Sequence, residues 1–165
     1  MHTLTVPPND DWHSRNHARR EEQRAAWAGF LGRVPWQLFV TLTFDPKRHA
    51  ADSVTASREA FWWCCQTARI YRVPAAWAYA PERGFTGLWH AHVLMVGTPM
   101  RIPEACGMWK ARNGHIDVRP VTDRQGASLY TSKSAALTGD IVWSDTCRRH
   151  MSSAEGRIAL YPDRA

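Results

Sequence analysis

His90 and His92 lie two residues apart within an apolar run that is typical of a buried strand, residues 89–96. Strand side chains alternate between the two faces, so both imidazoles are expected on one face. Two imidazoles that converge from one strand supply half of a metal site. The alternative is a pair of partly buried histidines satisfied by hydrogen bonds, since His tolerates an interior position.

A carboxylate, Glu82, ends another short apolar segment, residues 77–82. Residues 83–87 contain two glycines and predict a hairpin connection to the histidine strand. If the two strands pair, Glu82 and His90 lie near the same end of the hairpin. One carboxylate and two imidazoles bind a divalent cation and leave positions open for water or a phosphate oxygen. No cysteine joins the group, which argues against a closed zinc site; the alternative for Glu82 is a solvated turn residue.

Tyr130 and Lys133 follow Thr122 and Asp123, which are typical residues of a helix N-cap. On a helix, residues three apart share a face. A phenol beside an ammonium group makes a nucleophile with a partner that positions a phosphate. The alternative is an amphipathic tyrosine next to a surface lysine, because this spacing is common.

Three segments in this order resemble the motifs of the HUH endonucleases, in particular the single-tyrosine replication initiators (Rep proteins) of rolling-circle plasmids and small phages. They are a threonine-rich strand at 39–46, the His-Ala-His strand and the Tyr-Thr-Ser-Lys segment at 130–133. The resemblance covers residues 36–137. Ala91 departs from the bulky residue of the family, but it faces away from the predicted site. Only one tyrosine lies in the third motif, so the two-tyrosine branch is not supported.

The resemblance implies nicking and joining of single-stranded DNA at a replication origin, which initiates rolling-circle replication. His90, His92 and Glu82 would hold Mg2+ or Mn2+, and Tyr130 would attack the scissile phosphate and form a covalent 5′-phosphotyrosine. Because that bond retains the energy for rejoining, no ATP is needed. Lys133 would steady a phosphate or the phenolate.

Other residues are candidates for contact with DNA. Thr41 and Thr43 share a strand face, where they would bind DNA or support the site; β-branched strand filler is the alternative. Trp89 is expected next to the histidine site, where it is a candidate for stacking on an unpaired base, with a place in the core as the alternative. Arg19 and Arg20 belong to a basic segment that would grip DNA beside the nick, and a solvated helix face is the alternative.

The elements that must position these residues follow from periodicity and turn signals. Strands are expected at residues 36–44, 75–80, 88–96, 114–121 and, at an edge, 140–143. Helices are expected at residues 12–31, 53–71, 103–109 and 124–136. From the first strand to the fourth, this order is the split βαβ or ferredoxin-like arrangement, an α+β fold. We expect an antiparallel-rich sheet with helices on one face and the histidines on the other, beside the Tyr130 helix.

The composition suits one basic domain. The chain has 165 residues, a formal net charge of +6 and nine tryptophans, which favours a polyanionic partner such as single-stranded or hairpin origin DNA. We divide it into an N-terminal basic helical arm (1–35), an endonuclease domain (36–143) and a C-terminal tail (144–165). His115, in the fourth predicted strand, is interpreted as structural.

Localisation and partners follow from what the sequence lacks. Four cysteines without a Cys-x-x-Cys pair indicate reduced thiols, and neither a signal peptide nor a membrane-length apolar run is visible, so we expect a cytoplasmic protein without a membrane partner. Without a P-loop motif, unwinding would need a separate host or replicon helicase.

Two other functions stay open. A single-tyrosine HUH transposase shares the chemistry, although the threonine-rich strand and Lys133 favour Rep. A non-catalytic DNA-binding module, for instance an autorepressor, would shift oligonucleotides in a gel but form no adduct that survives denaturation.

Overall fold

The computed structural model of the chain describes residues 10–48, 52–138 and 141–147, and side chains within 16–48, 52–133 and 141–147. Within these ranges the strands are β1 (Leu38–Phe44), β2 (Ala76–Arg83), β3 (Trp89–Val96), β4 (Gly114–Pro120) and β5 (Val142–Trp143). The helices are α1 (Asp10–Leu31), α2 (Ser53–Ile70), α3 (Pro103–Arg112) and α4 (Arg124–Thr138). The chain is therefore an α+β protein, as predicted, and the predicted tail beyond residue 147 lies outside the described residues.

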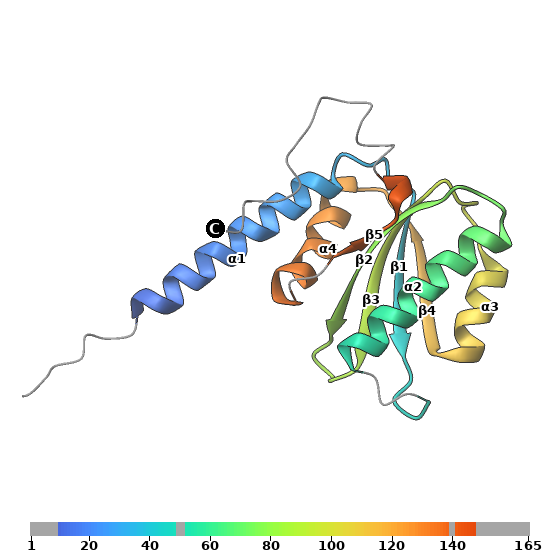
Figure 1. Cartoon of the computed structure of the whole chain (residues 1–165), viewed down its shortest axis with the longest axis horizontal. Helices are drawn as coiled ribbons and strands as arrows, with labels where there is room; N and C mark the ends of the chain where they lie inside the picture. The colour runs from blue at the N-terminus through green and yellow to red at the C-terminus, as the bar shows by residue number, and fades with distance from the viewer. Residues whose placement is uncertain (1–9, 49–51, 139–140, 148–165) are drawn as a thin grey trace, which may run out of the picture.

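All five strands belong to one sheet, with the order β4-β1-β3-β2-β5 (Figure 1). Every pair of neighbouring strands is antiparallel. From β1 to β4 the elements follow the predicted order strand-helix-strand-strand-helix-strand. β5 has two residues and pairs with Ala78 and Tyr79 at the outer side of β2, so it is an edge strand, as expected.

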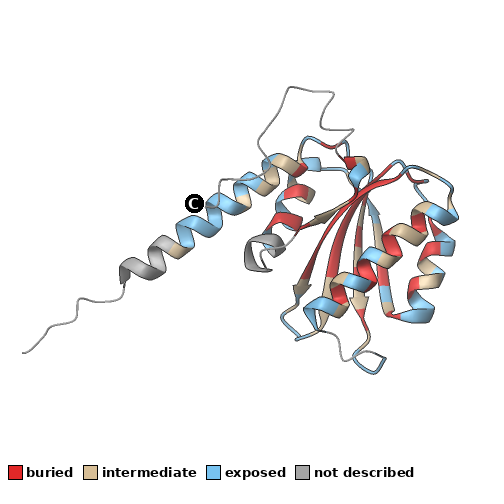
Figure 2. Ribbon diagram, in the orientation of Figure 1, coloured by how far each residue is buried: buried red, intermediate tan, exposed pale blue. Residues whose placement is uncertain are grey.

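One face of the sheet is covered by α2 and α3 and holds the larger core (Figure 2). The N-cap of α2 is Asp52, one residue before the predicted Ser53, and its side chain accepts the Thr55 N–H at 2.7 Å. α2 packs on β2 and β3, and its apolar stripe shares one core with the even-numbered side chains of β1. Trp63, fully buried, donates its indole N–H to the Ala105 carbonyl at 2.9 Å and so fixes α2 against α3.

The other face is partly covered by α4 and by the end of α1, so the expectation of helices on one face is wrong. α4 packs on β2 and β3, and α1 packs on α4. The physical reason lies in β2, whose alanines at 76, 78 and 80 are all fully buried on this face. Such a flat apolar strip needs cover, and small side chains let a helix approach closely. Toward Glu82 this cover ends, and the strand ends carry polar side chains.

The first helix docks by its C-terminal half, as expected, and its N-terminal half extends away from the sheet (Figure 1). Trp27 and Phe30 pack against Trp143 of β5 with ring centroids 5.7 and 5.6 Å apart. Arg19 and Arg20 are exposed on the extended half.

Candidate active site

The strand register brings five of the predicted site residues onto one sheet face. Thr41 lies opposite His92 and Thr43 opposite His90 in the β1–β3 pair. Glu82 lies opposite His90 in the β2–β3 pair, as the predicted hairpin requires. Residues directly opposite one another in antiparallel strands point to the same side, so these side chains form one polar cluster at the end of the sheet.

Each imidazole of the cluster contacts a threonine hydroxyl through Nδ1. The distance is 3.0 Å from Thr43 Oγ1 to His90 and 3.4 Å from Thr41 Oγ1 to His92. The two rings are nearly parallel, with 9° between their planes and 6.4 Å between their centroids. In His90, an Nδ1–H that donates to the Thr43 hydroxyl leaves the lone pair on Nε2, the arrangement that supports metal-binding histidines. In His92, Nε2 carries the proton while it donates to the Glu82 carboxylate, and a bound cation would move that proton to Nδ1, beside Thr41. The structure thus favours the supporting role of Thr41 and Thr43, whereas their contact with DNA stays a prediction.

Glu82 completes the cluster through His92, its diagonal neighbour across the β2–β3 pair. Its Oε2 lies 3.1 Å from Nε2 of His92. Burial lowers the pKa of both imidazoles, and the nearby Glu82 carboxylate opposes that shift. The pair is therefore biased toward the neutral form, which has a lone pair to donate to a cation.

A glycine in the hairpin makes room for one of these rings. A Cβ at Gly84 would lie 2.7 Å from Nε2 of His90, so a larger residue there would displace the ring. The hairpin itself is closed by the Gly84 N–H, which donates to the Leu88 carbonyl at 2.8 Å. Gly84 therefore serves both the turn and the ring beside it.

The donor types suit a divalent cation, but they are not arranged as a finished ligand set. Across residues 10–48, 52–138 and 141–147, no three His, Cys, Asp or Glu side chains are grouped to hold a metal. Glu82 and Nε2 of His92 contact each other. A cation between them would replace that hydrogen bond with bonds to the same two atoms. The residues therefore match a divalent cation in the type of donor atom they supply.

Tyr130 reaches the same cluster from α4. Asp123 caps this helix by accepting the Gly126 N–H at 3.0 Å, as predicted. The Tyr130 ring lies edge-on to His92, with centroids 4.9 Å apart, and it is 49% exposed. Lys133 lies one turn further along and is exposed. The pKa of His92 is lowered mainly by burial of the ring, and the positive charge of Lys133 lowers it further. The YxxK segment and the histidine strand therefore meet.

The other described tyrosines are poor candidates for a nucleophile. Tyr79 is buried on the α2 face, where its hydroxyl donates to the Ser57 carbonyl, and burial raises its pKa to about 12. Burial and the Glu104 carboxylate raise the pKa of Tyr71 to about 12. Tyr161 lies outside the described residues.

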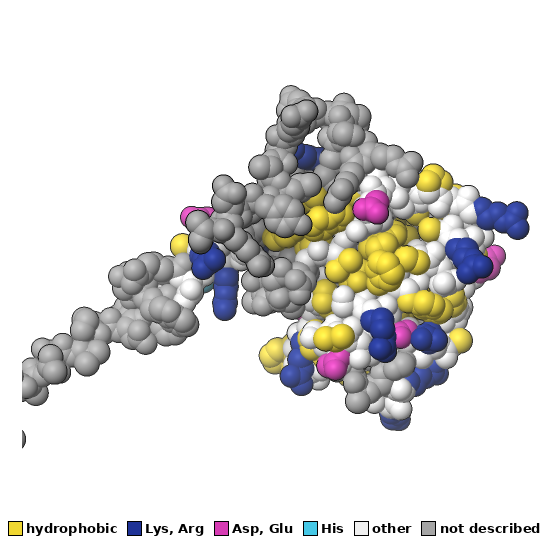
Figure 3. Space-filling model, in the orientation of Figure 1, with side chains coloured by type: hydrophobic (Ala, Val, Ile, Leu, Met, Phe, Trp, Pro, Cys, Tyr) yellow, Lys and Arg dark blue, Asp and Glu magenta, His cyan; other side chains and the backbone are white. Residues whose placement is uncertain are grey.

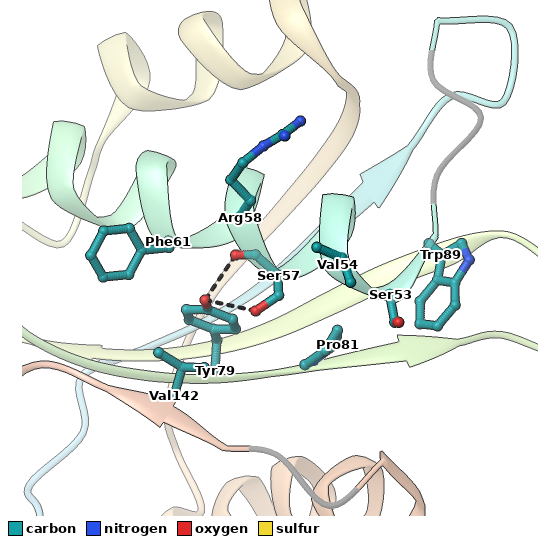
Figure 4. A pocket seen from close by; sticks show the side chains of 9 residues that line it. All are labelled: Ser53, Val54, Ser57, Arg58, Phe61, Tyr79, Pro81, Trp89 and Val142. Carbon is teal, nitrogen blue, oxygen red and sulfur yellow. Dashed lines mark hydrogen bonds between the residues drawn. The ribbon is translucent and has the colours of Figure 1, made fainter.

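Trp89 does not lie next to the histidine cluster, and that expectation is wrong. Because strand side chains alternate, its indole lies on the α2 face, where it packs against the larger core. There it lines a hollow of about 720 Å³ with Ser53, Val54 and Phe61 (Figure 4). Figure 3 shows this face, with apolar side chains gathered at its centre and basic ones around them. A core position is the better interpretation, and DNA stacking by Trp89 stays a prediction.

Two residues that are not among the predicted site residues share the face of the histidines. In the β1–β4 pair, Asp117 lies opposite Thr41 and Arg119 opposite Phe39. Arg119 Nε donates to Asp117 Oδ2 at 2.6 Å. The alternation of polar residues at 115, 117 and 119 is the sequence signal that marks this face. His115 is exposed rather than built into the core.

The comparisons with known proteins give no family. No protein-family model matches the chain, and no curated protein or solved structure matches it. None of the described helices is long and apolar enough to cross a membrane. All four cysteines lie within the described residues as free thiols; Cys64 and Cys147 are buried, as expected of reduced core thiols, whereas Cys65 and Cys106 are half-buried.

Proposed function

We propose that this chain is a metal-dependent HUH-type endonuclease that nicks and rejoins single-stranded DNA, with Tyr130 as the nucleophile, in the role of a rolling-circle Rep protein. The proposal includes the fold: the elements from β1 through β4 along the chain form the ferredoxin-like arrangement. The observation that carries it is the position of Tyr130, half exposed and edge-on to His92 at 4.9 Å between centroids. Segments more than 30 residues apart in the sequence thus meet at one cluster.

The histidines and Glu82 hold the cation in this proposal. Their donors are the Nε2 atoms of His90 and His92 and a carboxylate oxygen, while the threonines fix the rings through Nδ1. A bound Mg2+ or Mn2+ supplies Lewis-acid polarisation of the scissile phosphate. The lowered pKa of both imidazoles keeps them neutral and able to bind near pH 7.

Tyr130 carries out the covalent step. Its oxygen attacks phosphorus, the bond from phosphorus to the 3′ oxygen breaks, and the phenol proton is balanced by the proton gained at the new 3′-OH. The reverse reaction rejoins the strand, because a phenolate leaves more easily than an alkoxide. Lys133, exposed one turn from Tyr130, offers its ammonium to a phosphate of the bound strand.

The partners in this proposal are single-stranded or hairpin origin DNA and a separate helicase, in the cytoplasm. Support comes from the charge of +6 and from the exposed Arg19 and Arg20 on α1. A transposase would perform the same chemistry at transposon ends, so the DNA that flanks the gene distinguishes these two roles.

An adduct assay tests the proposal. The protein is incubated with a labelled pool of randomised single-stranded oligonucleotides and Mn2+, then denatured and separated on a gel. We expect a covalent adduct that EDTA prevents and that Tyr130→Phe abolishes, because only the hydroxyl is lost. Tyr71→Phe, on the other face, is the matched control and retains the adduct. A gel shift without any adduct would instead favour the non-catalytic DNA-binding module.

A further inference from the structure

A hollow of about 420 Å³ lies beside Tyr130, between α4 and the β1 and β4 strands. Phe39 and Thr41 of β1, Asp117 and Arg119 of β4 and Tyr130 line it. Its size falls within the range of about 300–1,000 Å³ that is usual for small-ligand sites. The proposed reaction uses Tyr130 but gives no role to Asp117 and Arg119.

The guanidinium of Arg119 is held by one nitrogen and presents the other two. Within the described part of the chain, its contact is through Nε, which donates to Asp117 Oδ2 at 2.6 Å. The side chain is 73% exposed and belongs to the lining of the hollow, so its terminal amino groups are accessible to a ligand. Asp117 thereby fixes the direction of an arginine that would otherwise rotate freely.

We propose that this hollow, the Asp117–Arg119 pocket, recognises a guanine base of the DNA strand, immediately beside the phosphate that Tyr130 attacks. Two amino groups on one guanidinium match the O6 and N7 acceptors of guanine, whereas adenine presents a donor in place of O6. The Phe39 ring and the Ala127 methyl group give the pocket apolar surface for the flat base. This inference rests on the proposed function, since it assumes that the strand passes Tyr130.

The pocket lies close enough to the nucleophile to fix the cleavage position. Tyr130 is part of its wall, and the same phenol ring contacts Phe39 edge-on at 5.7 Å between centroids. A base seated there belongs to the nucleotide next to the attacked bond. Recognition of that base would set which phosphate lies in line with the Tyr130 oxygen.

The test separates base recognition from phosphate binding. The Tyr130→Phe protein, which keeps the ring and cannot cleave, is mixed with a randomised single-stranded pool, and the bound fraction is sequenced. We expect guanine to be enriched at one position. Arg119→Lys, which keeps the charge but loses the paired donors, should reduce that enrichment about tenfold while total affinity changes less than twofold. Asp117→Asn should weaken the enrichment to a smaller extent. Arg101→Lys, an exposed arginine in the loop before α3, is the matched control and leaves it unchanged.

The outcomes distinguish the two proposals. Guanine enrichment that persists in Arg119→Lys, or a bound pool without base preference, overturns the pocket. Enrichment that depends on Arg119, in a protein whose wild-type form makes no covalent adduct, supports the pocket and rejects the nuclease. Adducts without guanine preference support the nuclease and reject the pocket.

Discussion

Two carboxylates on opposite faces of the sheet show how one residue type builds either structure or a site. Glu59 of α2 is 3% exposed and accepts from Arg112 at 2.7 and 3.2 Å and from Asn113 at 3.4 Å. Glu82 of β2 lies 3.1 Å from the His92 ring at the open end of the other face.

The difference lies in the partner. Arg112 is permanently charged and fits a carboxylate with a fork of donors, so Glu59 is held by fixed donors that tie α2 to the end of α3. The hydrogen bond from Arg112 lowers the pKa of Glu59, despite burial. An imidazole can instead be neutral, and its two tautomers differ: a nitrogen that carries the proton donates to a carboxylate, and a nitrogen without it binds a cation. The first cluster is closed by its chemistry, and the second can exchange its hydrogen bond for a ligand.

The largest expected effect is on the histidine side of the comparison. His90→Ala and His92→Ala should each reduce Mn2+-dependent adduct formation by at least about 100-fold, because two remaining ligands hold a hard cation poorly. Calorimetric titration with Mn2+ in the Tyr130→Phe background measures the binding directly. His115→Ala removes an exposed imidazole on the same face and serves as the control. Near-normal adduct yield in either of the first two variants would remove that histidine from the site.

Much of the fold was predictable from the sequence because the pattern of the strands is local. The alternation in residues 89–96 and the glycines of the hairpin predicted that Glu82 would meet His90 at one end, and the register confirms it. The same alternation places Trp89 on the other face, so that error came from using sequence proximity in place of the strand period.

The remaining features depend on long-range packing. The alanines of β2 fix where α4 lies, and this determines how much of the histidine face stays open. The hydrogen bond between Glu82 and its diagonal neighbour His92 follows from side-chain geometry in the folded sheet. The Asp117–Arg119 pair lines a hollow that exists only because α4 lies across that side of the sheet, which no local pattern predicts.

The two carboxylates should contribute to different properties: Glu59 mainly to stability and Glu82 mainly to metal binding. Glu59→Gln should lower the free energy of unfolding by about 2 kcal/mol, because it leaves buried donors without a charged acceptor. Glu82→Gln should lower it by less than about 1 kcal/mol and weaken Mn2+ binding about tenfold. Urea unfolding and calorimetry give the two quantities. Equal stability loss in the two variants, or full Mn2+ affinity in Glu82→Gln, would abolish the distinction.

The two clusters should also lose stability in different pH windows when metal is removed with EDTA. A histidine whose pKa is lowered by folding contributes stability above its unfolded pKa of about 6.5, and loses it as the pH falls from there. The lowered pKa of Glu59 gives the same sign in a window that begins near 4.5. His92→Gln should reduce the pH dependence of the free energy of unfolding in the first range, and Glu59→Gln should reduce it in the second. Urea unfolding at a series of pH values measures both. A single window that neither variant alters is the contrary result.

The smallest expected effect concerns the arm. Arg19→Gln with Arg20→Gln should weaken binding of single-stranded DNA a few-fold and reduce the slope of log affinity against log salt by about 1, since two phosphate contacts are lost. Adduct formation on a short oligonucleotide should persist. The pair Arg69→Gln with Arg72→Gln, at the end of α2, removes the same charge as a control. An identical change in both pairs would show a general charge effect and no role for α1.

The most direct test of the central claim is to identify the residue that becomes linked to DNA. The Mn2+-dependent adduct is digested with nuclease and protease, and the peptide that carries the remaining nucleotide is sequenced by mass spectrometry. Among the four tyrosines of the chain, we expect the nucleotide on Tyr130 alone. A nucleotide on Tyr71, Tyr79 or Tyr161, or on a residue other than tyrosine, would contradict the assignment of the histidine face as the active site.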